Sequence, residues 1–436
     1  MEDHRVKELL TKYCKFLPIP IKFGTREVGE GDDKKVEDVI INNPEPAWTK
    51  KPTKLKDEDY KSFYTELYGF SEPPLFWIHL NVDHPFNLTG ILYFPKLKNT
   101  YEVQKNKINL YQKQVFVTDQ VEEIVPEFLM LLHGVIDSPD IPLNVSRSYL
   151  QSDQNVKKIN SYITKKVADK LKSIYKKDQK EFEKNWEHVG LFVKYGMLSD
   201  PKFDEKAKEF CVLENTKGKF FLKEDYKKRI KKYQTNKDKK VVVLYSTDVE
   251  EQDSYIKAAE NAGYDVLKLN AIIDPHFISH LERADSDLQF ARVDAGTLNE
   301  LIDKGEEADS VLSEDEQSRL KELYESLENG EGTTVELKSL SPNESPVLIT
   351  RPEFNRRMKE MAAMGGGGMQ FMGELPDQIN VIVNTNHPLA TKVLKAKKNK
   401  AKYAKQLVNL AKLSQGLLKG AELTSFVNES VELMDD

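Results

Sequence analysis

The segment GVIDSPDIPLNVSR, residues 134–147, separates two stretches of the chain that differ in periodicity. Short apolar runs at 75–80, 88–94 and 115–117 precede it, and their β-branched and aromatic content is typical of strands. From residue 156 to residue 174, apolar residues recur at spacings of three and four, which predicts a long amphipathic helix. The Asp, Ser and Pro residues of the segment predict a turn-rich connection. Strands followed by a loop and a helix indicate an α/β fold here.

The second half of the chain repeats this alternation. Residues 241–245 and 266–269 have strand patterns, and a helical stretch at 255–262 lies between them, which favours a parallel βαβ crossover. Further strands are expected at 335–340, 347–350 and 379–383, and the tail 392–434 is expected to be helical throughout. Residues 300–331 carry twelve acidic and three basic residues, so we expect a domain boundary near residue 305.

Composition excludes several classes of protein. The two cysteines of the 436 residues, Cys14 and Cys211, are too few for a disulfide framework or a closed zinc site, so we expect buried structural thiols in a reducing, cytoplasmic compartment. No run approaches the length of a membrane span, and the N-terminus lacks the apolar core of a secretory signal. The net charge of −6 argues against a nucleic-acid binder, so the lysine-rich runs 223–240 and 392–405 are expected to be solvated helix faces.

Conventional enzyme motifs are scarce. The sequence has no phosphate-binding loop of the GxxxxGK[ST] type, and the four glycines 365–368 follow a helix, which favours a flexible hinge. His276 and His280 lie four residues apart, but no glutamate occupies the metalloprotease position, so a partly exposed helix is expected and no metal. Arg147 is more informative, because it lies on a loop just before a helix and its planar fork suits bidentate phosphate contact. A surface or capping arginine is the alternative.

The loop residues resemble a known family. Residues 123–129, 134–140 and 143–147 closely resemble the middle domain of the heat-shock protein 90 chaperones, in particular their bacterial branch. Residues 47–49, 63–64, 92–95 and 285–293 fit the same family, so the resemblance covers essentially the whole chain. It implies a multidomain α/β (α+β) fold. Its parts are a large αβα subdomain (1–155), a helical coil (156–200), a small αβα subdomain (201–305) and a mixed α/β dimerisation domain ending in a helix bundle (306–436).

The resemblance also implies roles for particular residues. In this family the arginine that matches Arg147 reaches the γ-phosphate of ATP, with Gln151 and Asn144 at supporting positions. The family's N-terminal nucleotide-binding domain has no counterpart in this sequence, so we expect a fragment that neither binds ATP tightly nor hydrolyses it alone. ATP and magnesium would belong to the full-length protein, and no cofactor to this chain. Trp48 and Leu88 match positions on an exposed apolar surface of the middle domain.

Five of the nine methionines fall between residues 358 and 372, where flexible thioether side chains suit a surface that accepts varied partners. A core-packing helix is the alternative. We assign the binding of partly folded client proteins to Trp48, His276, Phe277, Phe354, Met358, Met361 and Met364.

In the tail, apolar residues with three-and-four spacing predict two amphipathic helices that could pair in a homodimer. A core helix within one monomer is the alternative. The dimer residues expected from this pattern are Leu407, Leu410, Leu417, Leu418, Leu423 and Phe426.

The leading hypothesis is therefore a chaperone fragment that binds clients as a dimer and supplies Arg147 to an ATPase domain outside these residues. Two rival hypotheses are a phosphoryl-transfer enzyme that uses Arg147 and a basic scaffold that binds nucleic acid.

Overall fold

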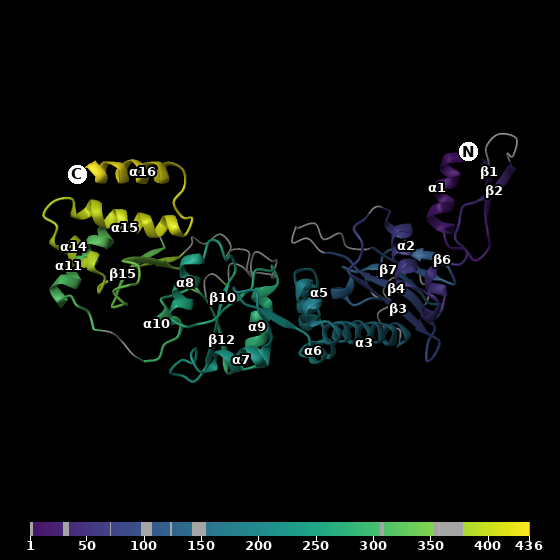
Figure 1. Cartoon of the computed structure of the whole chain (residues 1–436), viewed down its shortest axis with the longest axis horizontal. Coiled ribbons are helices and arrows are strands. Elements are labelled where there is room, and N and C mark those ends of the chain that lie inside the picture. Colours follow the sequence, from purple (N-terminus) through teal and green to yellow (C-terminus); the bar gives the residue numbers. More distant parts are fainter. Residues whose placement is uncertain are drawn as a thin grey trace. The chain divides into compact units, whose positions relative to one another are not determined.

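The computed structural model of the chain describes residues 3–28, 35–69, 71–96, 107–122, 124–141, 154–305, 309–330, 332–352, 357 and 378–435. It divides into two compact units, Met1–Cys211 and Val212–Asp436 (Figure 1). The division expected near residue 305 thus falls inside the second unit. The fold is a mixed α/β architecture with several small sheets, as the sequence predicts.

The first unit is built on a five-stranded sheet with the order β3-β4-β7-β5-β6. Its strands are β3 (Phe76–Val82), β4 (Leu88–Phe94), β5 (Lys107–Gln112), β6 (Val115–Thr118) and β7 (His133–Asp137). A separate hairpin pairs β1 (Lys22–Val28) with β2 (Lys35–Ile40), and the helices are α1 (Asp3–Cys14), α2 (Asp57–Tyr68), α3 (Gln154–Lys177), α4 (Gln179–Lys184), α5 (Trp186–Ser199) and α6 (Pro201–Ala207).

Strand β7 was not expected from the sequence, because its residues were assigned to the turn-rich connection. All five of its residues are buried, and it lies in the middle of the sheet, antiparallel to β4 and parallel to β5. Two glycines allow the backbones of β4 and β7 to approach closely. A Cβ on Gly134 would lie 2.0 Å from the Ile91 carbonyl oxygen, and one on Gly90 would lie 2.3 Å from the Val135 carbonyl oxygen. Only glycine fits at these two positions.

The predicted long helix is confirmed as α3, whose apolar face is buried at Val156, Ile159, Ile163, Val167 and Leu171. Helix α5 follows and is close to α6, with Gly196 packed against the rings of Phe203 and Phe128. These helices form the helical part of the first unit.

The second unit contains two three-stranded sheets and a short hairpin. Its strands are β8 (Val212–Glu214), β9 (Phe220–Leu222), β10 (Val241–Ser246), β11 (Val266–Lys268), β12 (Leu288–Arg292), β13 (Thr333–Lys338), β14 (Val347–Thr350) and β15 (Ile379–Asn384). The sheet orders are β11-β10-β12 and β13-β15-β14. The strands β10 and β11 are parallel, as predicted, and α8 (Asp253–Asn261) connects them.

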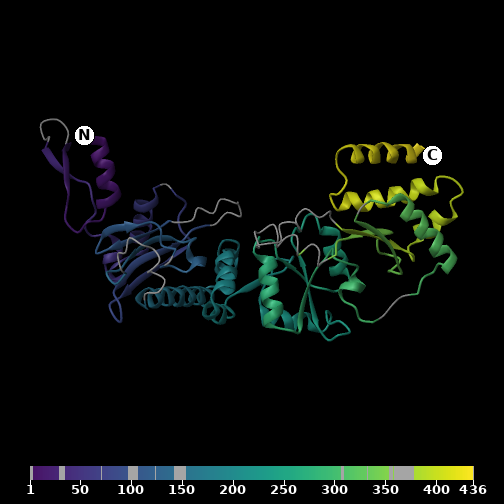
Figure 2. The ribbon, with the colours of Figure 1, turned by 180° about the vertical axis from the view of Figure 1, so that it is seen from behind.

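The remaining helices of this unit are α7 (Lys223–Lys231), α9 (Asp274–Ala284), α10 (Leu298–Leu301), α11 (Glu314–Leu327), α14 (Pro388–Lys395), α15 (Lys400–Ser414) and α16 (Gly420–Asp435). Helix α11 begins with a capping box between Ser313 and Glu316. The tail is not helical throughout, because residues 396–399 and 415–419 separate three helices. Figure 2 shows α15 and α16 side by side, joined by an ion pair between Lys405 and Glu429 (2.9 Å).

Replacing Gly134 by alanine should destabilise the first unit strongly. The new Cβ would force β7 away from β4, so we expect the free energy of unfolding to fall by about 3 kcal/mol or more in urea titration. Gly218→Ala is the matched control, since Gly218 also has a positive φ (+69°) but nothing lies within 4 Å of its Cβ position. Equal losses in the two variants would contradict the close-approach argument.

Candidate functional site

Within the segment 134–147, strand β7 ends in a buried carboxylate. Asp137 is the last residue of β7 and is 6% exposed. Its Oδ2 accepts hydrogen bonds from Trp48 Nε1 (3.2 Å) and from the backbone N–H of Gln114 (2.9 Å). Its Oδ1 accepts a bond from the backbone N–H of Lys113 (2.8 Å). Three donors from two separate segments therefore converge on one charged side chain.

Two of these donors belong to a strained turn. Lys113 and Gln114 join β5 to β6, and their φ angles are +51° and +68°. Residues with a Cβ rarely adopt this backbone conformation. Two-residue hairpin turns that require it usually contain Asn and Gly. Charge-assisted hydrogen bonds from both amides to Asp137 compensate for the unfavourable backbone. The carboxylate thus stabilises the hairpin as well as the end of β7.

A second carboxylate continues the network toward the loop. Asp140 Oδ2 accepts a hydrogen bond from the backbone N–H of Asn87 (2.6 Å), and the Ser138 hydroxyl donates to the Asn87 carbonyl (2.6 Å). Gln112 Nε2 donates to the carbonyl oxygen of Pro139 (3.0 Å). Residues 137–140 are therefore attached to the sheet by side-chain hydrogen bonds. The predicted residues Asn144, Arg147 and Gln151 follow directly and lie outside the described residues.

Trp48 does not lie on an exposed apolar surface, contrary to expectation. Its side chain is fully buried, with ring centroids 4.7 Å from Phe16 and 5.2 Å from Tyr111. Leu88, expected on the same surface, is also fully buried, in strand β4. The sequence shows that both residues are apolar but not that other segments cover them. Burial raises the pKa of the Tyr111 hydroxyl, and the charge of Asp137 raises it further.

Phe277 and His276, which are also predicted to bind clients, differ in burial. Phe277 is fully buried in α9, so its assignment to a binding surface is wrong, while His276 on the same helix is partly exposed.

Within the described part of the chain, no group of three or more His, Cys, Asp or Glu residues could hold a metal ion. Cys211 is buried as expected, but Cys14 is partly exposed. Four further client-binding assignments fall outside the described residues: Phe354, Met358, Met361 and Met364.

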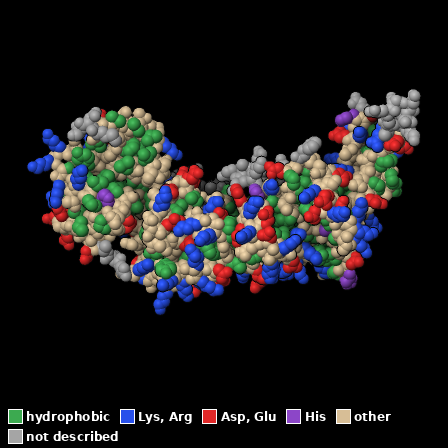
Figure 3. All heavy atoms as spheres, viewed as in Figure 1, with side chains coloured by type: hydrophobic (Ala, Val, Ile, Leu, Met, Phe, Trp, Pro, Cys, Tyr) green, Lys and Arg blue, Asp and Glu red, His purple; other side chains and the backbone are tan. Residues whose placement is uncertain are grey.

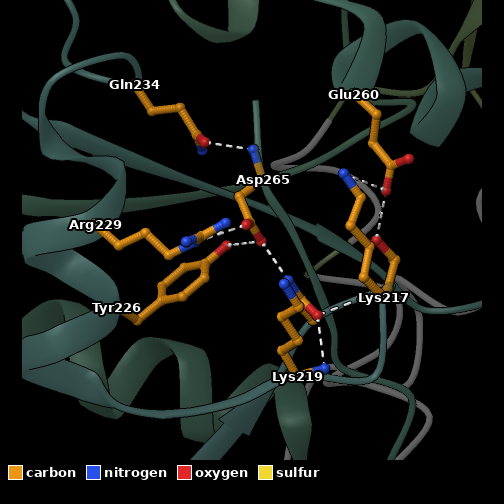
Figure 4. Close-up of polar contacts among 9 residues, drawn as sticks. Lys217, Lys219, Tyr226, Arg229, Gln234, Glu260 and Asp265 are labelled. Carbon is orange, nitrogen blue, oxygen red and sulfur yellow. Dashed lines mark hydrogen bonds and ion pairs between the residues drawn. The ribbon is translucent and has the colours of Figure 1, made fainter. Parts of the chain in front are cut away.

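A polar cluster in the second unit centres on Asp265, just before β11 (Figure 4). Its carboxylate accepts hydrogen bonds from Asn215 Nδ2 (2.9 Å), the Tyr226 hydroxyl (3.3 Å) and Arg229 Nε (3.0 Å). Its backbone N–H donates to Gln234 Oε1 (2.7 Å). Burial raises the pKa of Tyr226, and the negative charge of Asp265 adds to the effect. This carboxylate joins the β8–β9 hairpin to α7 and β11, so we assign the cluster a structural role.

Helices α15 and α16 expose apolar side chains, and Figure 3 shows hydrophobic atoms gathered over this part of the second unit. The buried face of α15 uses small residues, including Ala404, Val408 and Ala411. The exposed large residues on the two helices are Tyr403 (37%), Leu410 (48%), Leu413 (41%), Val427 (49%) and Val431 (57%). We refer to these five residues as the tail surface.

Of the residues predicted for a dimer contact, Leu410 belongs to the tail surface, while Leu407, Leu417 and Leu423 are partly buried. Leu418 and Phe426 are only 5% and 6% exposed, so their assignment to a dimer surface is wrong. The other four residues of the tail surface, Tyr403, Leu413, Val427 and Val431, do not belong to the predicted set. The alanines of α15 could have identified its buried face in the sequence, because small residues at three-and-four spacing lie on the face that packs on the sheet.

None of the helices in the described part of the chain combines the length and apolar character needed to cross a membrane.

Comparison with known proteins identifies the class to which this architecture belongs. The family model described as "Hsp90 protein" matches residues 25–429. The chaperone protein HtpG of Porphyromonas gingivalis is 52% identical over 405 residues, which cover 91% of this chain and 59% of that protein. The HtpG of Bacteroides thetaiotaomicron is 51% identical over 401 residues (90% and 58%), and that of Halalkalibacterium halodurans is 29% identical over 443 residues (96% and 68%).

The chain therefore belongs to the Hsp90 family. It spans 59% of the length of the Porphyromonas relative.

Replacing Asp137 by asparagine should destabilise the first unit. An amide has one acceptor oxygen, and its NH₂ group would face at least one of the three converging donors. We expect the free energy of unfolding to fall by about 2 kcal/mol, the cost of a buried unsatisfied donor. Urea denaturation of the two forms gives the difference. Asp83→Asn makes the same chemical change at an exposed residue and should alter stability little. Stability unchanged in Asp137→Asn would contradict the role assigned to the carboxylate.

Proposed function

We propose that this chain is the client-binding and dimer-forming portion of an ATP-driven chaperone that acts in the cytoplasm. Its Arg147 assists ATP hydrolysis by a nucleotide-binding domain outside these residues. The observation that carries the proposal is the attachment of residues 137–140 to the sheet by the Asp137 and Asp140 carboxylates, in a chain of the Hsp90 family. Arg147 follows Asp140 by seven residues in the sequence, so the hydrogen-bonded residues 137–140 come shortly before it in the chain.

The chemistry suits an arginine. Phosphoryl transfer spreads negative charge over the oxygens of the γ-phosphate, and a fixed guanidinium stabilises that charge in the transition state. Gln151 and Asn144 offer neutral amide donors and acceptors beside it. A base that does not move between ground state and transition state makes such stabilisation effective, because no reorganisation is needed during the reaction. ATP and magnesium would be supplied by the nucleotide-binding domain.

The arginine is tested by joining this chain to the nucleotide-binding domain of its own full-length protein and measuring ATP turnover. Arg147→Ala should lower kcat about a hundredfold, because a charged donor to the transition state is removed. Arg147→Lys should recover part of the rate, since it keeps the charge but loses the bidentate fork. Turnover that is insensitive to both substitutions would exclude the role proposed for Arg147.

For the dimer, the supporting observation is the tail surface. Five exposed large apolar residues lie on α15 and α16, whose mutual contact includes polar pairs such as Lys402–Glu432 (3.2 Å). A second copy of the same two helices would cover the tail surface by forming a symmetric helix bundle. Partly folded clients would then bind to a dimer, which can engage one polypeptide at two places.

Truncation after Leu418 should convert the chain from dimer to monomer in light scattering. Val427→Asp tests the same surface with a single charge and should weaken association about tenfold or more, because a buried unpaired carboxylate opposes contact. Val311→Asp is the matched control, since Val311 is 67% exposed and lies outside the tail surface. A dimer that survives both the truncation and Val427→Asp would remove α16 from the interface.

A further inference from the structure

The short connection between α11 and β13 contains the single Asn–Gly pair of the sequence, Asn329–Gly330. Both residues are exposed and lie outside any helix or strand. Helix α11 ends directly before them, because Glu328 is its C-terminal cap and donates its backbone N–H to the Tyr324 carbonyl (3.0 Å). The pair therefore lies at the surface, in a part of the backbone that no helical or ladder bonding holds.

An asparagine that precedes a glycine can react with its own backbone. The backbone nitrogen of Gly330, after losing its proton, forms a bond to Cγ of the Asn329 side chain. The Cγ–Nδ2 bond breaks, the amide leaves as ammonia, and a five-membered succinimide ring remains. Water then opens the ring at either of its two carbonyls, which gives aspartate or isoaspartate at position 329. Water is the one co-reactant, and nothing is oxidised or reduced.

The local structure leaves the two reacting groups accessible. Among the described residues, none makes a hydrogen bond to the Gly330 N–H or to the side-chain amide of Asn329. The carbonyl of Gly330 is used, since it accepts a bond from the Thr333 N–H (3.1 Å). A Cβ built on Gly330 would meet Thr333 Oγ1 at 3.5 Å and nothing closer. Ring closure at this position is therefore not crowded by neighbouring atoms, and glycine adds no side chain of its own.

Other asparagines of the second unit lack this combination. Asn215 and Asn384 are 1% and 0% exposed, and their side chains donate to Asp265 and to the Ser341 carbonyl. Asn343 is exposed, but the residue that follows it is a glutamate, whose side chain hinders ring closure. Exposure, an unbonded amide and a following glycine thus coincide at Asn329.

The product would place a new negative charge at a sensitive end of α11. The Glu328 carboxylate is only 10% exposed and pairs with Lys412 of α15 (2.6 Å). The two helices also share a buried cluster that includes Tyr324 and Val408. A carboxylate at position 329 would follow Glu328 directly, at the helix end where the macrodipole already disfavours negative charge. The last turn of α11 would therefore become less stable, and it is this turn that holds α15.

We propose that Asn329 deamidates spontaneously in the folded protein and that the resulting carboxylate loosens the last turn of α11. The modified form accumulates with the age of the molecule, because the reaction needs only water and hydrolysis does not restore the amide. Helix α15 displays Tyr403, Leu410 and Leu413 of the tail surface, so the modification acts on the support of that surface. The inference does not depend on the proposed chaperone function, since the chemistry belongs to the backbone.

Peptide mass spectrometry of the whole chain after incubation at mildly alkaline pH tests the modification. The peptide that contains Asn329 should convert from amide to acid and separate into aspartate and isoaspartate forms, while the peptide that contains Asn343 should not. Conversion should accelerate as the pH rises, because the attacking backbone nitrogen must lose its proton. Equal conversion at the two asparagines, or none at Asn329, would overturn the proposal.

Gly330→Ala tests the route of the reaction. Gly330 has no left-handed φ and its Cβ position is in ordinary contact with Thr333, so alanine fits the folded chain. The added methyl group should slow conversion of Asn329 about tenfold or more, because it restricts the approach of the backbone nitrogen. Conversion at the wild-type rate in this variant would exclude attack by the Gly330 nitrogen.

Hydrogen exchange of the whole chain tests the consequence. Asn329→Asp should make the amides in the last turn of α11 exchange about threefold faster, and added salt should reduce the difference. Asn343→Asp is the matched control, since it adds the same charge to an exposed loop and should leave α11 unchanged. Exchange in α11 that is the same in Asn329→Asp as in the wild-type chain would overturn the effect proposed for the new carboxylate.

Discussion

The carboxylate of Asp137 holds together three parts of the first unit that are distant in sequence. The indole of Trp48 and the β5–β6 turn both donate to it, and it ends the central strand of the five-stranded sheet. A buried carboxylate is costly unless its oxygens are satisfied, and here three donors satisfy it. The left-handed backbone of Lys113 and Gln114 persists because it delivers two of those donors.

This arrangement also fixes the residues that directly follow β7. The side chains of Asp137, Ser138 and Asp140 bond to the β5–β6 turn and to Asn87, just before β4. The polar side chains of residues 137–140 therefore hold this stretch in place by hydrogen bonds, although the sequence suggests a simple turn.

In the second unit, the parallel sheet and the C-terminal sheet are joined by contacts that cross the expected boundary near residue 305. Arg357 pairs with Glu282 (2.9 Å), Tyr255 donates to the Ile349 carbonyl, and Leu348 packs against the core of the parallel sheet. The acidic composition of residues 300–331 suggests a domain boundary. Composition does not show which surfaces pack together in the folded chain.

Local sequence patterns were enough to predict the elements with clear periodicity: the long helix α3, the parallel pair β10 and β11 with α8, and three of the five strands of the first sheet. It also carried the resemblance to the family, because the loop motif is local. Only the folded chain shows that His133–Asp137 is a central strand, that Trp48 and Phe277 are covered, and that Leu410 but not Phe426 is exposed. The physical reason is that periodicity identifies an apolar face, whereas burial depends on which distant segment packs against that face.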